Sequence, residues 1–181
     1  FTIKGYLAGI IVVVSAYIIA YLNAFADDVF PYTAWEVIFS TLLGIFYLGF
    51  FFKEDSWFNK NQPLSRRCLY FVVQFSLAFG VQLILRFSGM TWLITMPLVG
   101  SMANALPPLP RWIGYSAIVL GVYIPFAIRF STETAVSITI SVVAAMLFVA
   151  LFSQLLRREG EAREEAERLA TELESANRQL G

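Results

Sequence analysis

Four polar side chains interrupt strongly apolar parts of this sequence, and they are the first candidates for binding a ligand. Gln74, Gln82 and Arg86 follow one another at helical spacing, so on a helix they form a single polar stripe. Asn104 lies near the end of another apolar stretch. Because amide and guanidinium groups need partners in hydrocarbon, these residues suggest either a pocket for a ligand or water, or hydrogen bonds between helices with Arg86 reaching toward headgroups. Hydrogen bonding between helices is the simpler of the two interpretations.

The composition excludes most catalytic chemistry. The sequence has no histidine and one cysteine, Cys68, so it lacks the imidazoles and paired thiols of common metal sites, catalytic triads and disulfides. No carboxylate lies well inside an apolar stretch. We therefore expect no catalytic residue, no metal and no cofactor in this segment.

The elements that position these polar groups are long apolar stretches. Hydrophobic residues make up 58% of the sequence and charged residues 14%, whereas soluble domains average roughly 45–50% and ~25%. This composition predicts an all-α membrane protein. Six stretches have close to the ~20 residues that cross a bilayer as a helix: residues 6–25, 35–52, 68–87, 90–106, 112–130 and 134–156.

Two of these stretches are less regular than the others. The fourth is short, contains Pro97 and ends in a proline cluster at residues 107–110, which should stop a helix. The first could be a signal peptide, because residues 24–26 resemble a cleavage site. Its apolar run exceeds the ~7–15 residues of a signal sequence, so we expect a first membrane helix instead.

Basic residues are distributed unevenly between the two ends of the predicted helices. One side carries most of them, in the second and fourth loops and after the last helix: Lys53, Lys60, Arg66, Arg67, Arg111, Arg157 and Arg158. Arg86 and Arg129 lie on the other side, where the first loop is acidic. Because loops rich in lysine and arginine stay in the cytoplasm, we expect both termini to be cytoplasmic. The loops are short, so we expect the stimulus to be read within the bilayer, with lipid as a partner, or near its surface.

Small residues mark two faces on which helices could approach closely. They are Gly114, Ala117 and Gly121 in the fifth predicted helix, and Ser137, Ser141 and Ala145 in the sixth. For the fifth helix we expect packing within the chain. For the sixth, packing within the chain and contact with a second copy are both open.

Residues 157–181 differ from the rest of the chain and predict a coiled coil. They contain five arginines and seven glutamates around apolar residues at heptad spacing: Leu169, Leu173, Ala176 and Leu180. Nearer the membrane the seam is weaker, at Leu155, Glu159, Gly160, Ala162 and Ala166. Glycine disfavours a helix by about 1 kcal/mol relative to alanine, and facing glutamates repel, so we expect this signalling junction to shift between two packings.

We therefore expect two parts: a six-helix transmembrane sensor domain in residues 1–156 and a cytoplasmic signalling helix in residues 157–181. The last membrane helix would continue into a parallel two-stranded coiled coil, which makes the protein a homodimer. The alternative is a charged helix that remains a solvated stalk. We expect no nucleic-acid partner.

The end of the sequence also resembles a known family. The last apolar stretch, followed by Arg157-Arg158-Glu159 and later by the string from Glu174 to Leu180, is similar to the membrane-to-cytoplasm junction of bacterial sensor histidine kinases. The multispan types, DesK and the LiaS-like or NarL-family kinases, are nearest. The resemblance covers residues 134–181. It implies an inner-membrane receptor whose kinase domain, beyond this segment, uses ATP and Mg²⁺ and signals to a response regulator.

Other functions are compatible with the same sequence. Similar linkers precede diguanylate cyclase domains, so the output could be a cyclase. A small transporter or solute-binding subunit would account for six spans and a proline-broken fourth helix, although it has no need of a heptad tail. An intramembrane enzyme fits least, because the side chains that it would require are missing.

Overall fold

The computed structural model describes residues 3–26, 32–53, 62–87 and 90–180, with the backbone alone for residues 3–8, 23–26 and 176–180. All regular structure in these residues is helical. Along the chain the elements are α1 (Ile3–Ala26), α2 (Ala34–Phe52), α4 (Leu64–Ile84), a 3₁₀ helix η1 (Thr91–Thr95), α5 (Met96–Ala105), α6 (Pro108–Arg129) and α7 (Thr132–Leu180). The all-α prediction is therefore confirmed.

The helix boundaries follow from local capping chemistry. Thr33 and Glu36 form a capping box at the start of α2, in which the Thr33 hydroxyl accepts a hydrogen bond from Glu36 N and Glu36 Oε2 accepts one from Thr33 N. Pro97 lies in the first turn of α5, where a missing N–H costs nothing. The proline cluster ends α5 as predicted, and Pro108 begins α6 two residues after the extended Leu106.

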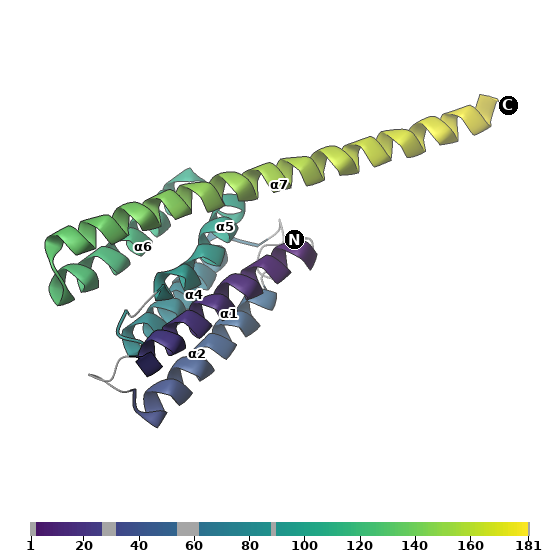
Figure 1. Cartoon of the computed structure of the whole chain (residues 1–181). Coiled ribbons are helices and arrows are strands. Elements are labelled where there is room, and N and C mark those ends of the chain that lie inside the picture. The colour runs from purple at the N-terminus through teal and green to yellow at the C-terminus, as the bar shows by residue number, and fades with distance from the viewer. Residues whose placement is uncertain (1–2, 27–31, 54–61, 88–89, 181) are drawn as a thin grey trace.

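The helices form two groups joined by a buried central segment (Figure 1). Helices α1, α2 and α4 lie together on one side, while α6 and α7 form an antiparallel hairpin on the other. Helix α5 lies between these groups and contacts α1, α4, α6 and α7. Seven of its ten residues are buried, whereas only four of the 19 residues of α2 are. Helix α5 is therefore the interior element around which the others are arranged.

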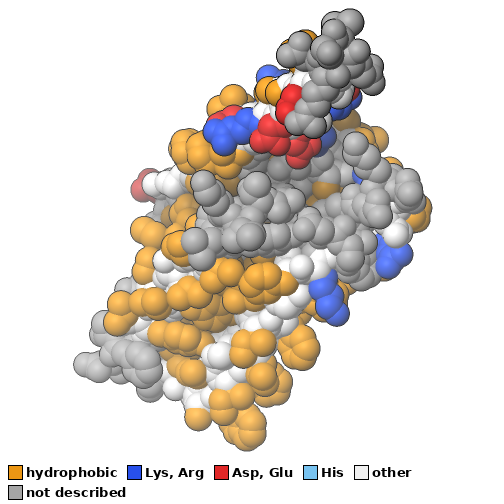
Figure 2. All heavy atoms as spheres, turned by 90° about the vertical axis from the view of Figure 1, so that its right-hand side faces the viewer, with side chains coloured by type: hydrophobic (Ala, Val, Ile, Leu, Met, Phe, Trp, Pro, Cys, Tyr) orange, Lys and Arg blue, Asp and Glu red, His pale blue; other side chains and the backbone are white. Residues whose placement is uncertain are grey.

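The predicted spans agree with the structure in part. Helices α2, α4, α6 and α7 are long and apolar enough to cross a membrane, and the described apolar part of α1 runs from Gly9 to Leu22. Figure 2 shows the hydrophobic side chains that cover much of one face of the bundle. The fourth predicted span differs from expectation, because it consists of a five-residue 3₁₀ helix and a ten-residue α-helix. Pro97 divides it and the proline cluster ends it before it reaches the length of a span.

Helix α7 is the longest element, at 49 residues, or about 74 Å at 1.5 Å per residue. One face of its first half is buried against the bundle, at Ala135, Val142, Met146 and Ala150. From Leu155 to Ser175 every side chain is exposed, and the helix extends beyond the bundle (Figure 1). The helix continues through Gly160 without a break. We call residues 157–180 the stalk, and the end of the bundle that it leaves the stalk end.

Candidate functional site

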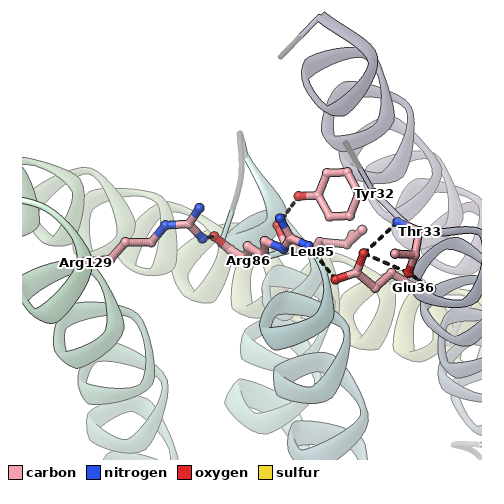
Figure 3. A network of polar contacts seen from close by, with 6 residues as sticks. All are labelled: Tyr32, Thr33, Glu36, Leu85, Arg86 and Arg129. Atoms are coloured by element: carbon pink, nitrogen blue, oxygen red, sulfur yellow. Dashed lines mark hydrogen bonds and ion pairs between the residues drawn. The ribbon is translucent and has the colours of Figure 1, made fainter. Parts of the chain in front are cut away.

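The first polar cluster lies opposite the stalk end and is centred on Arg86 (Figure 3). Arg86 Nη2 is 2.7 Å from Glu36 Oε1, and its guanidinium carbon lies 5.1 Å from the centre of the Tyr32 ring. The Tyr32 hydroxyl donates a hydrogen bond of 2.6 Å to Leu85 O. The Arg86 carbonyl in turn accepts a hydrogen bond from Arg129 on α6. This cluster therefore joins the start of α2 to the ends of α4 and α6.

The backbone conformation at Arg86 and Phe87 is one that residues other than glycine rarely adopt. Arg86 and Phe87 both have left-handed φ angles, of 52° and 53°, which cost on the order of 1 kcal/mol each. They are held there because the Arg86 side chain pairs with Glu36 while the buried Phe87 ring contacts the rings of Phe79 and Phe126. The bond to Glu36 also raises the pKa of Arg86.

This geometry corrects the predicted polar stripe. Gln74 and Gln82 are both buried on α4, but the helix ends at Ile84, so Arg86 follows the helix instead of lying on it. It turns toward Glu36 at the edge of the bundle (Figure 3). In the structure Arg86 forms an ion pair with Glu36, and its reach toward headgroups stays a prediction. Arg86, Arg129 and Glu36 do lie at one end of the bundle, as the charge distribution predicted.

Gln74 forms the second polar cluster, in the middle of the bundle. Its Nε2 donates to Tyr47 O on α2 at 3.2 Å and to the Tyr70 hydroxyl at 3.1 Å. The buried Tyr47 hydroxyl donates to Ile94 O in η1 at 2.8 Å. Gln74 therefore makes a hydrogen bond between α4 and α2 through its Nε2, while its buried Oε1 has no partner among the described residues. For Gln82, the buried Oε1 has no hydrogen-bond partner within the described part of the chain.

The third polar cluster surrounds the C-terminal end of α5, at the stalk end. Three arginines donate to the carbonyls of three successive residues: Arg111 Nη1 to Ala103 O at 3.0 Å, Arg157 Nη1 to Asn104 O at 3.0 Å, and Arg67 Nη1 to Ala105 O at 3.3 Å. The last carbonyls of a helix lack internal donors and carry the negative end of its dipole, so guanidinium groups stabilise them. We call Arg67, Arg111 and Arg157 the arginine collar. They come from α4, α6 and α7.

Two residues of the collar region behave differently from what the sequence suggested. Asn104 takes part through its backbone carbonyl, while its buried side-chain Oδ1 has no partner among the described residues. The sequence indicates Arg157 only as part of the basic flank that sets orientation. In the structure it also donates from Nε to Glu161 Oε1 at 2.8 Å, so it joins α5 to the first turn of the stalk. Its spacing in the sequence carries no signal of the contact with α5, because the acceptor lies 53 residues away.

Glycines let α5 approach its neighbours closely. A Cβ atom on Gly100 would lie 2.8 Å from Ser153 Oγ on α7, and one on Gly114 of α6 would lie 2.7 Å from Met102 Sδ. Contacts below 3.0 Å require something to move. Helix α5 therefore packs closely against α6 and α7, and a methyl group at either glycine would require a neighbouring side chain to shift.

The small residues that were predicted to form a packing face on α6 lie in different surroundings. Gly114 faces Met102, and Gly121 faces the rings of Phe75 and Phe79, whereas Ala117 is exposed. The buried side of α6 is instead completed by the large residues Ile118, Val122 and Phe126.

On α7, the serine face does not pack within the chain. Ser137 and Ser141 are exposed, with the Ser141 hydroxyl bonded to Ser137 O at 3.1 Å, and Ala145 is half-buried. The face that packs against the bundle lies roughly a third of a turn away, at Ala135, Val142 and Met146. Ser137 and Ser141 are therefore free of the bundle's core, whereas Ala145 packs against it, and contact with a second copy stays a prediction.

The junction and seam residues are exposed along the stalk. Leu155, Glu159, Gly160, Ala162 and Ala166 are all exposed, and a Cβ atom added to Gly160 would meet no other atom within 4 Å. Leu169 and Leu173 are 47% and 71% exposed. The side chains of Ala176 and Leu180 lie outside the described residues. A single chain cannot bury this seam, so the coiled coil stays a prediction.

The chain matches no protein-family model, and no curated protein and no solved structure is significantly similar to it. Its function therefore has to be argued from the geometry of its own helices.

Proposed function

We propose that this chain is the membrane sensor module of a homodimeric signalling receptor, in which α7 carries the signal out of the bundle. The observation that supports this most is the continuity of α7, whose 49 residues run from contacts with α5 and α6 into the exposed stalk. A continuous helix transmits rotation or axial movement from one end to the other. The membrane-embedded helices and the stalk therefore form a single mechanical unit.

The stalk supports the dimeric part of the proposal. Leu169 and Leu173 expose apolar surface to water, and heptad spacing places them on the same side of the helix as Leu155 and Ala162. A second α7 in parallel, related by a two-fold axis along the membrane normal, would cover this side. Both copies leave their bundles in the same direction, so a parallel pair needs no reversal of either chain.

We infer further that the output is a histidine kinase domain that follows the stalk. The support is the likeness of residues 134–181 to the junction of bacterial sensor kinases. ATP, Mg²⁺ and a response regulator would belong to that domain, and the whole receptor would lie in the bacterial inner membrane with both termini in the cytoplasm. The stimulus would be a change in the bilayer or an intramembrane ligand.

Cysteine cross-linking in the full-length receptor tests the dimer. In a Cys68→Ala background, Leu173→Cys on the proposed seam should form disulfide-linked dimers in native membranes. Thr171→Cys is the matched control. Thr171 lies two residues before Leu173, so its side chain is on nearly the opposite side of the helix, and it is also exposed. Equal cross-linking at both positions would show that the stalk has no defined seam.

The kinase output needs a separate measurement. The full-length receptor should label itself with the γ-phosphate of ATP, and the label should be stable to base and labile to acid, as phosphohistidine is. If the stalk dimerises but the receptor does not acquire this label, the proposed kinase output is refuted and the proposed sensor module stands.

A further inference from the structure

The stalk is attached to the bundle at the C-terminal end of α5. Among the described hydrogen bonds that join α7 to other helices, the bond from Arg157 Nη1 to Asn104 O is the one nearest to the stalk. From Leu155 to Ser175 all side chains are exposed. This bond therefore lies in the first turn of the exposed part of α7, three residues after the partly buried Gln154.

The arginine collar is built from two different kinds of helix. Arg67 and Arg111 come from α4 and α6, which lie within the bundle along their whole length (Figure 1). Arg157 comes from α7, which continues beyond it. Arg67 and Arg111 therefore fix the end of α5 in the bundle, and Arg157 fixes the stalk to that end.

Arg157 has a second partner that moves with the stalk. Its Nε donates to Glu161 one turn further along α7, and both side chains are more than half exposed. If the bond to Asn104 O breaks, the guanidinium keeps the Glu161 carboxylate and gains water. Breaking this bond therefore leaves no charged group buried and unpaired. The free-energy cost of moving α7 from one position to another is correspondingly small.

Helix α5 can carry movement to this point. It is short, it follows a 3₁₀ helix, and it ends in the extended Leu106 before Pro107, so it is a separate rigid piece that is not continuous with another α-helix at either end. At its other end, the Tyr47 hydroxyl bonds to Ile94 O in η1, in the middle of the bundle. Gly100 and Ser153 set how closely α5 and α7 approach along the way.

We infer that the bond from Arg157 to Asn104 O is a latch that holds α7 in one register against α5, and that its release frees the stalk to take another. The signalling consequence rests on the proposed function of α7, but the mechanical attachment does not. In the latched state the position of the stalk is fixed by the end of α5. When the bond is broken, the position of the junction from Glu159 to Ala166 is determined by its packing against the partner chain instead.

Two neighbouring arginines provide a matched test. Arg157→Gln and Arg158→Gln remove the same charge from the same membrane flank, but the structure describes a contact with α5 for Arg157 alone. Arg157→Lys keeps the positive charge but presents its donors from a single nitrogen, whereas Arg157 uses Nη1 for Asn104 O and Nε for Glu161. In each variant, spin labels on cysteines at Leu69 of α4 and Glu165 of the stalk, both exposed, report the distance between bundle and stalk. The full-length receptor is reconstituted in lipid nanodiscs, with Cys68 replaced by alanine and labelled chains diluted with unlabelled ones.

We expect Arg157→Gln to broaden or shift the Leu69–Glu165 distance distribution, Arg158→Gln to leave it unchanged, and Arg157→Lys to lie between them. Identical distributions for the two glutamine variants would overturn the latch. Receptor output should change about three- to tenfold for Arg157→Gln, the effect of losing one hydrogen bond between two states. If the distances change while the output does not, the latch stands and the proposed role of α7 in signalling fails.

Discussion

Replacing Gly100 by alanine tests whether α5 and α7 are in the close contact that the structure describes. The added Cβ would lie 2.8 Å from Ser153 Oγ and 3.5 Å from Val149 Cγ1. Overpacking of this kind costs about 1–3 kcal/mol, while replacing a helical glycine by alanine returns about 1 kcal/mol. We therefore expect Gly100→Ala to lower the free energy of unfolding by up to about 2 kcal/mol.

The compensating change is Ser153→Ala. It removes the oxygen and leaves Ser153 Cβ at 3.8 Å from the new methyl group, which is ordinary van der Waals contact. The free energy of unfolding of the double variant should therefore equal that of the wild type or be about 1 kcal/mol higher. A double-mutant cycle cancels the helix propensities of both residues and should give a coupling energy of about 1–3 kcal/mol.

Reversible unfolding in mixed micelles measures these free energies, and Gly49→Ala is the control. Gly49 also lies in a helix, but a Cβ there would meet nothing within 4 Å, so this change should be neutral or slightly stabilising. A coupling energy below about 0.5 kcal/mol between Gly100 and Ser153 would refute the close contact, because distant sites are additive within that error.

Three further predictions concern the other clusters. The free energy of unfolding of Arg86→Gly should be about 1 kcal/mol higher than that of Arg86→Ala. Both variants lose the guanidinium, but glycine tolerates the left-handed φ, and the same unfolding assay compares them. Tyr47→Phe removes the buried bond to Ile94 O and should cost about 1 kcal/mol, and an unchanged unfolding free energy would show that this bond contributes nothing. Glu159→Leu removes repulsion from the proposed seam, and Gly160→Ala stabilises the helix by about 1 kcal/mol, so each should bias receptor output. If autophosphorylation of both variants matches that of the wild type, the switch does not lie at this junction.

The helices could be predicted from the sequence because hydropathy and proline reveal them directly. The predicted stretch 35–52 corresponds to α2 (Ala34–Phe52), and the proline cluster separates α5 from α6 where expected. The burial of α5 could not be predicted in this way, because a helix facing lipid and a helix facing protein have the same apolar composition. The structure distinguishes them through Gly100, Ser101 and Met102, which are buried on different sides of one short helix.

The candidate site was less predictable, since its contacts join distant parts of the chain. Gln74 could be recognised because an amide in hydrocarbon needs partners, and its Nε2 has two of them, while its Oε1 has none among the described residues. The role of Arg157 could not, because an arginine at a membrane boundary is already explained by the charge rule, and its acceptor is a backbone carbonyl that any residue would provide. Arg86 was expected on the helix because hydropathy does not show that α4 ends at Ile84.

The two charged clusters share the helices that connect them. Helix α6 carries Arg111 in the collar at one end and Arg129, which bonds to the Arg86 carbonyl, at the other. Helix α4 begins near Arg67 in the collar and leads directly into Arg86. A perturbation of the Arg86 cluster that slides α4 against α6 would therefore displace two of the three donors that hold the end of α5. Arg157 is the third donor, and α7 shares no described hydrogen bond with the Arg86 cluster, so such sliding would act on α7 through α5 or through apolar packing against α6.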